Sequence, residues 1–183
     1  KEPKAGEERV FEIFKGVQMK FCWIPAGKSK LREPESKEEK EYETKGFWLG
    51  KYEVTQAEWQ AVMGADPSKF KGARLPVEQV SWDDCQEFLK KCKVAGLKVK
   101  LPHEDEWEYA CRGGLGNKRA FYWGDVLNGD KANCDGNYPY GTTTKGTYLE
   151  KTTPAGSYEK VASHPWGLCD MSGNVWEWCD NLY

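Results

Sequence analysis

The segment DMSGNVWE, residues 170–177, has the residue types and spacing for metal binding. Asp170 and Glu177 supply two carboxylates, and a turn at Gly173 and Asn174 frees backbone carbonyls between them. A calcium ion takes roughly six to eight oxygen ligands, which carboxylates and turn carbonyls can provide. Alternating tryptophans, as in NVWEW, are typical of a core strand. We therefore expect a calcium-binding turn that runs into a buried strand, and the alternative is an Asx-type turn with no cation.

Other kinds of catalytic or metal chemistry have weaker support. The chain has two histidines and no Cys-x-x-Cys pair, which argues against a zinc site. His103 precedes a predicted helix, where capping is the better explanation, and His164 is predicted to lie in a loop. Glu104 and Glu108 are one helical turn apart, but the helix dipole explains acids in a first turn. No cysteine or serine stands in a local motif with an activating base.

Composition limits the classes of protein that the chain can form. Its 183 residues suffice for one domain with one core, and a net charge of -2 without a basic stripe argues against nucleic-acid binding. No apolar run reaches the roughly 18 residues of a membrane span, and the polar N-terminus does not resemble a signal peptide. Aromatic residues make up 14 % of the chain beside 19 Gly and 9 Pro, which predicts a loop-rich fold.

Two regions of the first half have strand-like patterns. Residues 10–24 predict two strands joined by a turn at Lys15 and Gly16, because apolar and polar residues alternate on both sides of that turn. Residues 46–54, GFWLGKYEV, predict another strand that is rich in aromatic and β-branched residues. Residues 28–45 lie between these patterns and are almost all charged or polar, so we expect an exposed or mobile loop there.

Three short helices are predicted from their capping residues. Thr55 and Glu58 form a capping box, and a glycine supplies the left-handed stop. Ser81 and Asp84 repeat that box before a second helix. The apolar face of the second helix consists of residues at helical spacing: Trp82, Cys85, Phe88, Leu89 and Cys92. A third helix follows Pro102, begins with three acids and ends at a Gly-Gly pair.

Six sequence blocks occur in an order and rough spacing that identify a family. They are GKYEVTQAEW, LPVEQVSWDDCQEFLKKC, LPHEDEWEYACRGGLGN, FYWGD, PAGSY and WGLCDMSGNVWEW. From about residue 17 to the end, the chain resembles the formylglycine-generating-enzyme (sulfatase-modifying factor) domain family. The resemblance implies one α+β domain over residues 1–183 with a C-type-lectin-like fold of the formylglycine-generating-enzyme type. Short helices and twisted antiparallel strands characterise that fold.

The resemblance also bears on the seven cysteines. It implies that the chain lacks the family's C-terminal segment, in which active formylglycine-generating enzymes carry two catalytic cysteines. Cys92 and Cys111 match positions that in secreted members bond to cysteines of that segment, so both are disulfide candidates and explain the odd count. The alternative for Cys92 is a small buried residue of its helix. Cys169 and Cys179 flank the Gly-Asn turn and could pair with each other.

Two calcium sites follow from the same resemblance. The first has two side-chain and two backbone ligands: Asp170, Glu177, Gly173 and Val175. The second would lie near ANCDGN, where Asn133 and the Cys134 carbonyl align with family ligands. Its acidic partner would fall in PAGSY, where glycine and serine stand instead of an aspartate. The second site is therefore the weaker prediction.

Two functions from different classes are consistent with these features. The favoured one is a noncatalytic ligand-binding or display scaffold for a protein, peptide or glycan, as in retroelement-diversified variable proteins that share the family fold. The alternative is a copper-dependent formylglycine-generating or related oxidase whose catalytic cysteines lie beyond residue 183, because that chemistry needs two close thiolates. The cysteine matches to secreted relatives favour a secreted or surface-anchored location.

Overall fold

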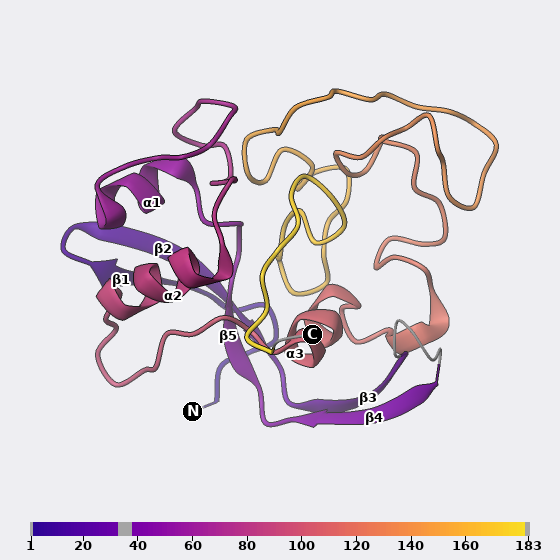
Figure 1. Ribbon diagram of the computed structural model, residues 1–183. Coiled ribbons are helices and arrows are strands. Elements are labelled where there is room, and N and C mark those ends of the chain that lie inside the picture. The colour runs from indigo at the N-terminus through magenta and orange to yellow at the C-terminus, as the bar shows by residue number, and fades with distance from the viewer. Residues whose placement is uncertain (1, 33–37, 182–183) are drawn as a thin grey trace.

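The computed structural model describes residues 2–32 and 38–181 and has the predicted α+β architecture (Figure 1). One antiparallel sheet has the order β1-β2-β5, with β1 at Glu8–Phe14, β2 at Val17–Ile24 and β5 at Phe47–Gly50. A separate antiparallel pair consists of β3 (Gly27–Arg32) and β4 (Glu39–Thr44). The helices are α1 (Gln56–Met63), α2 (Trp82–Lys91) and α3 (Glu104–Cys111), and a 3-10 turn follows at Gly116–Lys118.

The β1-β2 hairpin turns at Lys15 and Gly16, as the sequence predicts. Gly16 has φ +76°, in the left-handed region that favours glycine. One face of the hairpin is buried, with Ile13 only 1 % exposed and Met19 9 % exposed. Because side chains alternate across a strand, this face packs against the helices while the polar residues stay in solvent.

The predicted loop at residues 28–45 is wrong, because most of this segment belongs to β3 and β4. Residues 33–37 of that prediction lie outside the described residues. Leu31 is 1 % exposed, and the Tyr42 ring lies 5.4 Å from that of Tyr109. Lysine–glutamate pairs join the two strands on the outer face. A strand pair needs apolar residues only at alternate positions, so a highly charged segment can still form one.

All three helices begin at their predicted capping residues. The Thr55 and Ser81 side chains each accept the hydrogen bond of an N3 backbone N–H, and the N3 acids reach back to complete both boxes. His103 Nδ1 accepts from the backbone N–H of Asp105 at 3.2 Å, so His103 is a capping residue as predicted. No helix within residues 2–32 and 38–181 is long and apolar enough to cross a membrane.

Two clusters of buried hydrophobic residues form the interior. One lies between the β1-β2 hairpin, α1 and α2, where the rings of Trp59 and Phe88 stack at 5.1 Å. The other joins β2 and α3 to the loops that follow α3. Its buried members are Cys22, Ile24, Tyr109, Ala110, Tyr122, Ala162, Trp166, Leu168 and Met171. The later loops therefore complete a core that the regular elements begin.

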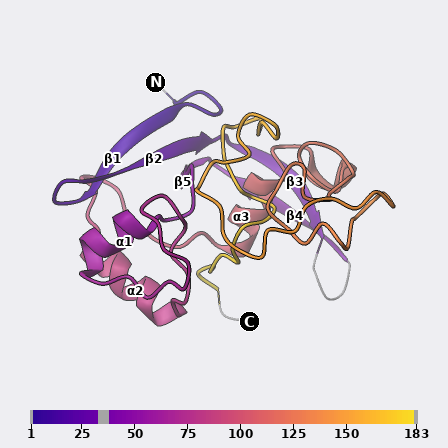
Figure 2. The ribbon, with the colours of Figure 1, turned by 90° about the horizontal axis from the view of Figure 1, so that it is seen from above.

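The region after the 3-10 turn has neither a helix nor an extended strand in residues 119–181. Figures 1 and 2 show α1 and α2 on one side of the molecule and these loops on the other. The predicted buried strand after the Gly-Asn turn is wrong, because Trp176 is fully exposed and Trp178 is half exposed. This final segment is fixed by hydrogen bonds instead, since Trp82 Nε1 donates to the Cys179 carbonyl at 2.9 Å.

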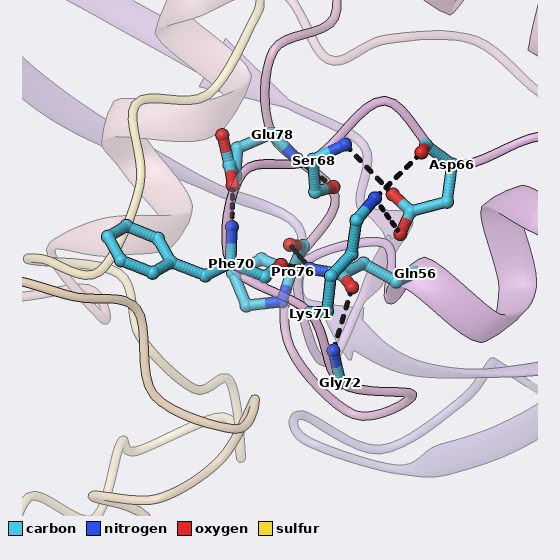
Figure 3. Close-up of polar contacts among 8 residues, drawn as sticks. All are labelled: Gln56, Asp66, Ser68, Phe70, Lys71, Gly72, Pro76 and Glu78. Carbon is cyan, nitrogen blue, oxygen red and sulfur yellow. Dashed lines mark hydrogen bonds and ion pairs between the residues drawn. The ribbon is translucent and has the colours of Figure 1, made fainter.

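A loop at residues 64–78 connects α1 to the rest of the fold and is held by buried polar contacts (Figure 3). The Gln56 side chain is 3 % exposed; its amide nitrogen donates to the Phe70 carbonyl, and its oxygen accepts from the Gly72 N–H. Farther along, the backbone N–H of Val77 donates to the Val54 carbonyl at 2.9 Å. The loop thereby fixes the segment that runs from β5 into α1.

Candidate metal centre

Asp170 is held by a series of hydrogen bonds that begins in the loop of residues 64–78. Arg74 and Ala155 exchange two hydrogen bonds, one of them from the guanidinium to the Ala155 carbonyl at 3.0 Å. The next residue, Gly156, donates its N–H to Asp170 Oδ2 at 2.6 Å. Burial raises the pKa of Asp170, and the Gly156 bond partly opposes that shift. The Oδ2 atom of the Asp170 carboxylate is therefore engaged by Gly156.

The predicted turn exists and closes against the segment that contains Asn133. The Asn174 N–H donates to the Asn133 carbonyl at 2.9 Å, and the Val175 N–H donates to the Gly173 carbonyl at 3.0 Å. A side chain at Gly173 would place its Cβ 2.5 Å from the Asn133 oxygen, so only glycine fits there. The two segments predicted to form separate calcium sites thus lie at one place.

Asn174 connects three segments by hydrogen bonds, whereas the sequence predicted only that it lies in the turn. Its Oδ1 accepts from Asn133 Nδ2 at 3.0 Å and from the Thr153 N–H at 2.9 Å, while its Nδ2 donates to the Thr153 carbonyl at 3.0 Å. Burial raises the pKa of Cys134, whose thiol accepts from the Gly129 backbone.

Glu177 lies beside α3, where Trp107 Nε1 donates to its Oε2 at 3.2 Å. Although the residue as a whole is exposed, the protein around its carboxylate removes enough water to raise the pKa of Glu177 to about 7. The Trp107 hydrogen bond opposes this shift, and the Asp170 carboxylate adds to it. The Asp170 carboxylate thus acts electrostatically on Glu177, while the Glu159 carboxylate acts on Asp170.

Glu53 is a third acidic residue at this place, and it was not predicted. It is 8 % exposed, and neither carboxylate oxygen has a hydrogen-bond partner among the described residues. Burial, followed by repulsion from Asp170 and Glu177, raises the pKa of Glu53 to about 9. The Asn174 amide lies near enough to oppose the shift but forms no hydrogen bond to either oxygen. The sequence does contain a signal that Glu53 is buried. It stands an even number of positions after Phe47 and Leu49, whose side chains pack against the core.

These residues fit a calcium site in which carboxylates and other oxygen ligands together surround the ion. The three carboxylates influence one another, and none of them forms an ion pair with Lys or Arg within residues 2–32 and 38–181. No group of three or more His, Cys, Asp or Glu side chains in the same ranges is close enough to hold a metal ion by itself. Backbone carbonyls or water would therefore have to supply ligands, as calcium allows.

The cysteines are all unbridged and protected from reaction. All seven are free, including Cys92 at the end of α2 and Cys111 at the end of α3. Cys92 is buried in the cluster of α1 and α2, while Cys111 donates to the Met171 carbonyl at 3.1 Å. Burial raises the pKa of every one of these thiols. A thiol with a raised pKa is a poor nucleophile and a poor metal ligand near neutral pH.

Known proteins with similar sequences carry the same domain. The family model of the sulfatase-modifying factor enzyme 1-like domain matches residues 11–183. A formylglycine-generating enzyme of Streptomyces coelicolor is 37 % identical over 141 residues, which are 75 % of this chain and 41 % of that relative. An inactive C-alpha-formylglycine-generating enzyme 2 of Bos taurus is 30 % identical over 138 residues, which are 75 % of this chain and 42 % of that relative. The chain thus spans about two fifths of these relatives.

Solved structures show the same fold at lower sequence identity. Treponema denticola variable protein 1 has a TM-score of 0.67 and 22 % identity, over 94 % of this chain and 76 % of that chain. PvdO from Pseudomonas aeruginosa has a TM-score of 0.70 and 21 % identity, over 100 % of this chain and 77 % of that chain. The predicted C-type-lectin-like fold of the formylglycine-generating-enzyme type is therefore confirmed.

Proposed function

The chain belongs to the sulfatase-modifying factor enzyme 1-like domain family, and we propose that it is a noncatalytic ligand-binding or display scaffold. The observation that carries the proposal is the fully exposed side chain of Trp176, next to a backbone that the Trp178–Val80 hydrogen bond fixes. Burial raises six thiol pKa values to about 11 or 12 and also raises that of Cys134. Copper-dependent oxidation of a cysteine requires a pair of close thiolates. None of these seven thiols is prepared for that role.

Trp176 is the residue that we propose to contact a ligand. Its side chain is fully exposed, whereas the carboxylate of the neighbouring Glu177 accepts from Trp107 Nε1 of α3. Trp178 Nε1 donates to the Val80 carbonyl at 3.0 Å, which fixes the backbone on the other side. Large aromatic side chains on a fixed backbone are typical of binding hot spots, because little conformational entropy is lost on binding. The ligand class we propose is a protein, peptide or glycan.

Calcium is the cofactor that we propose for this scaffold. Its ligands would be the side chains of Asp170 and Glu177 and the backbone carbonyls of Gly173 and Val175. The bound ion would supply positive charge between repelling carboxylates and stiffen the turn that presents Trp176. We propose one ion and not two, because Asn133 binds the same turn. Extracellular calcium modules bind in the range of about 10⁻⁴–10⁻³ M, which suits a secreted or surface-anchored location.

A second candidate function is a copper-dependent formylglycine-generating or related oxidase. Relatives at 35–37 % identity that are named formylglycine-generating enzymes favour it. A relative at 30 % identity that is named inactive favours the scaffold. The seven cysteines described above would not supply the catalytic pair, so catalysis would need cysteines that lie beyond residue 183.

One experiment separates the two functions. The full-length protein is incubated with copper and a Cys-x-Pro-x-Arg peptide, and the peptide is analysed by mass spectrometry. We expect the cysteine to remain unchanged, and a formylglycine product would contradict the scaffold. Glycan and peptide arrays then test binding, with the Trp176→Ala variant as the matched control. We expect array signals that weaken in that variant, and equal signals would exclude Trp176 as the contact residue.

A further inference from the structure

Glu53 is a buried acid that the proposed calcium ligands leave without a role. Its two carboxylate oxygens are buried, and the described residues offer them no hydrogen bond. Buried carboxylates in folded proteins are normally paired with a cation or accept several hydrogen bonds. The isolation of Glu53 is therefore evidence that another chemical group belongs beside it.

The backbone around Glu53 prevents its side chain from escaping into solvent. On one side, the Lys51 carbonyl accepts from the Cys169 N–H at 2.9 Å, and the Lys51 N–H donates to the Lys20 carbonyl at 2.9 Å. On the other side, the Val54 carbonyl accepts from Val77, which belongs to the loop of Figure 3. These contacts hold the carboxylate in the interior, so its environment has to be satisfied there.

The surroundings of Glu53 are negative. The Asp170 and Glu177 carboxylates both act electrostatically on it, and the nearby Asn174 amide gives one of its two N–H donors to the Thr153 carbonyl. Lys51 is buried two residues away, but its ammonium group is paired with Glu8 and Glu159. A bound cation would favour the ionised form of these acids, which otherwise hold a proton to higher pH.

We propose that Glu53 is an outer-shell residue of the calcium site, where it accepts hydrogen bonds from water bound to the ion. This inference rests on the proposed site at Asp170 and Glu177. The side chains of the three acids do not converge closely enough to hold a metal ion directly. Calcium commonly keeps water among its ligands, and such water donates the hydrogen bonds that the Glu53 oxygens lack. Outer-shell partners of this kind tune metal affinity.

The competing explanation is a permanently neutral Glu53 that has no connection to a metal. A neutral carboxyl is uncharged, as glutamine is, so the Glu53→Gln variant would bind calcium as the wild type does. An outer-shell carboxylate would behave differently, because the variant would lose its charge and one acceptor oxygen. The two explanations thus give opposite expectations for one conservative substitution.

The experiment is calcium titration calorimetry on the wild type, Glu53→Gln and the matched control Glu41→Gln, which removes an exposed acid of β4. We expect calcium affinity to fall by about tenfold or more in Glu53→Gln and to stay within about twofold in Glu41→Gln. Equal affinities for the wild type and Glu53→Gln would overturn the inference and leave the proposed site intact. No binding by the wild type would overturn the site and the inference together.

Thermal unfolding provides a second readout, which does not require that calcium binding release a measurable heat. Without calcium, we expect Glu53→Gln to melt within about 2 °C of the wild type, because a pKa of about 9 leaves the Glu53 carboxyl uncharged near neutral pH. With saturating calcium, we expect the wild type to gain more stability than the variant. Equal calcium-dependent gains in melting temperature for the wild type and the variant would overturn the inference.

Discussion

The region around α1 and α2 is held together in a different way from the region after α3. In the first, stacked aromatic rings and aliphatic side chains pack between the helices and the β1-β2 hairpin. In the second, residues 119–181 have no regular element, and side-chain contacts to backbone groups fix the turns around Asn174 and Asp170. Apolar packing is self-sufficient, whereas buried acids depend on what neutralises them. Conditions that change charge should therefore affect the second region more than the first.

The largest loss of unfolding free energy should come from Trp59→Ala, which changes the first region alone. The substitution removes the ring that stacks on Phe88 in the interior of the α1-α2 region. Replacing a buried aromatic residue by alanine costs about 3–5 kcal/mol of unfolding free energy. Urea denaturation should show this loss equally with and without calcium. Trp176→Ala is the control, because that exposed tryptophan should contribute less than about 0.5 kcal/mol.

Acid should destabilise the second region through His164. His164 Nδ1 accepts from the Trp166 N–H at 3.0 Å, and Nε2 lies 2.9 Å from the Ala110 carbonyl, so the buried ring is neutral. Burial lowers the pKa of His164 from 6.5 to about 4. The unfolded chain binds the extra proton between these values, so stability is complete above pH 6.5 and falls as the pH drops toward 4. The loss should approach about 3 kcal/mol.

Unfolding free energies at pH 7, 5.5 and 4 check this expectation. The His164→Gln variant should have a flatter pH profile than the wild type, whatever its stability at pH 7. A His164→Gln profile as steep as that of the wild type would contradict the role of this histidine.

A smaller loss of unfolding free energy is expected from Asn174→Ala. The substitution leaves the Thr153 N–H and carbonyl and the Asn133 amide without their partner. Losing such part-buried hydrogen bonds costs about 1–3 kcal/mol, and the turn that carries the proposed ligands should loosen as well. Denaturation and calcium titration should both report the change. Asn117→Ala is the control, because the Asn117 side chain makes an exposed contact to Glu39 and should have little effect.

The same contrast explains which parts of the fold the sequence predicts. The capping residues Thr55, Ser81 and His103 are local signals, and each helix begins where they indicate. The β3-β4 pair was missed because average composition hides the alternate positions of Leu31 and Tyr42. The strand after Asn174 was wrong for a related reason, since two alternating tryptophans do not show which of them meets the core.

The candidate site was predictable only in part. Asp170, Gly173 and Glu177 lie in one short motif, so their proximity follows from the sequence. Glu53 reaches the same place through the β5-α1 connection, which is a long-range consequence of the fold. Asn133 was assigned to a second site, because its contact with Asn174 depends on how two distant loops return. The residues of one short motif could thus be predicted from the sequence, whereas the contacts between segments that are distant in the sequence could not.

The most direct test of a cation-dependent second region is amide hydrogen exchange with and without calcium. The wild type and Glu177→Gln are compared, and the exchange of peptides from residues 133–177 is measured against that of peptides from α1 and α2. We expect calcium to slow exchange around Asn133, Thr153 and residues 170–177 in the wild type only, with no change in α1 and α2. Calcium protection that is absent in the wild type, or equal in Glu177→Gln, would contradict a calcium-held region.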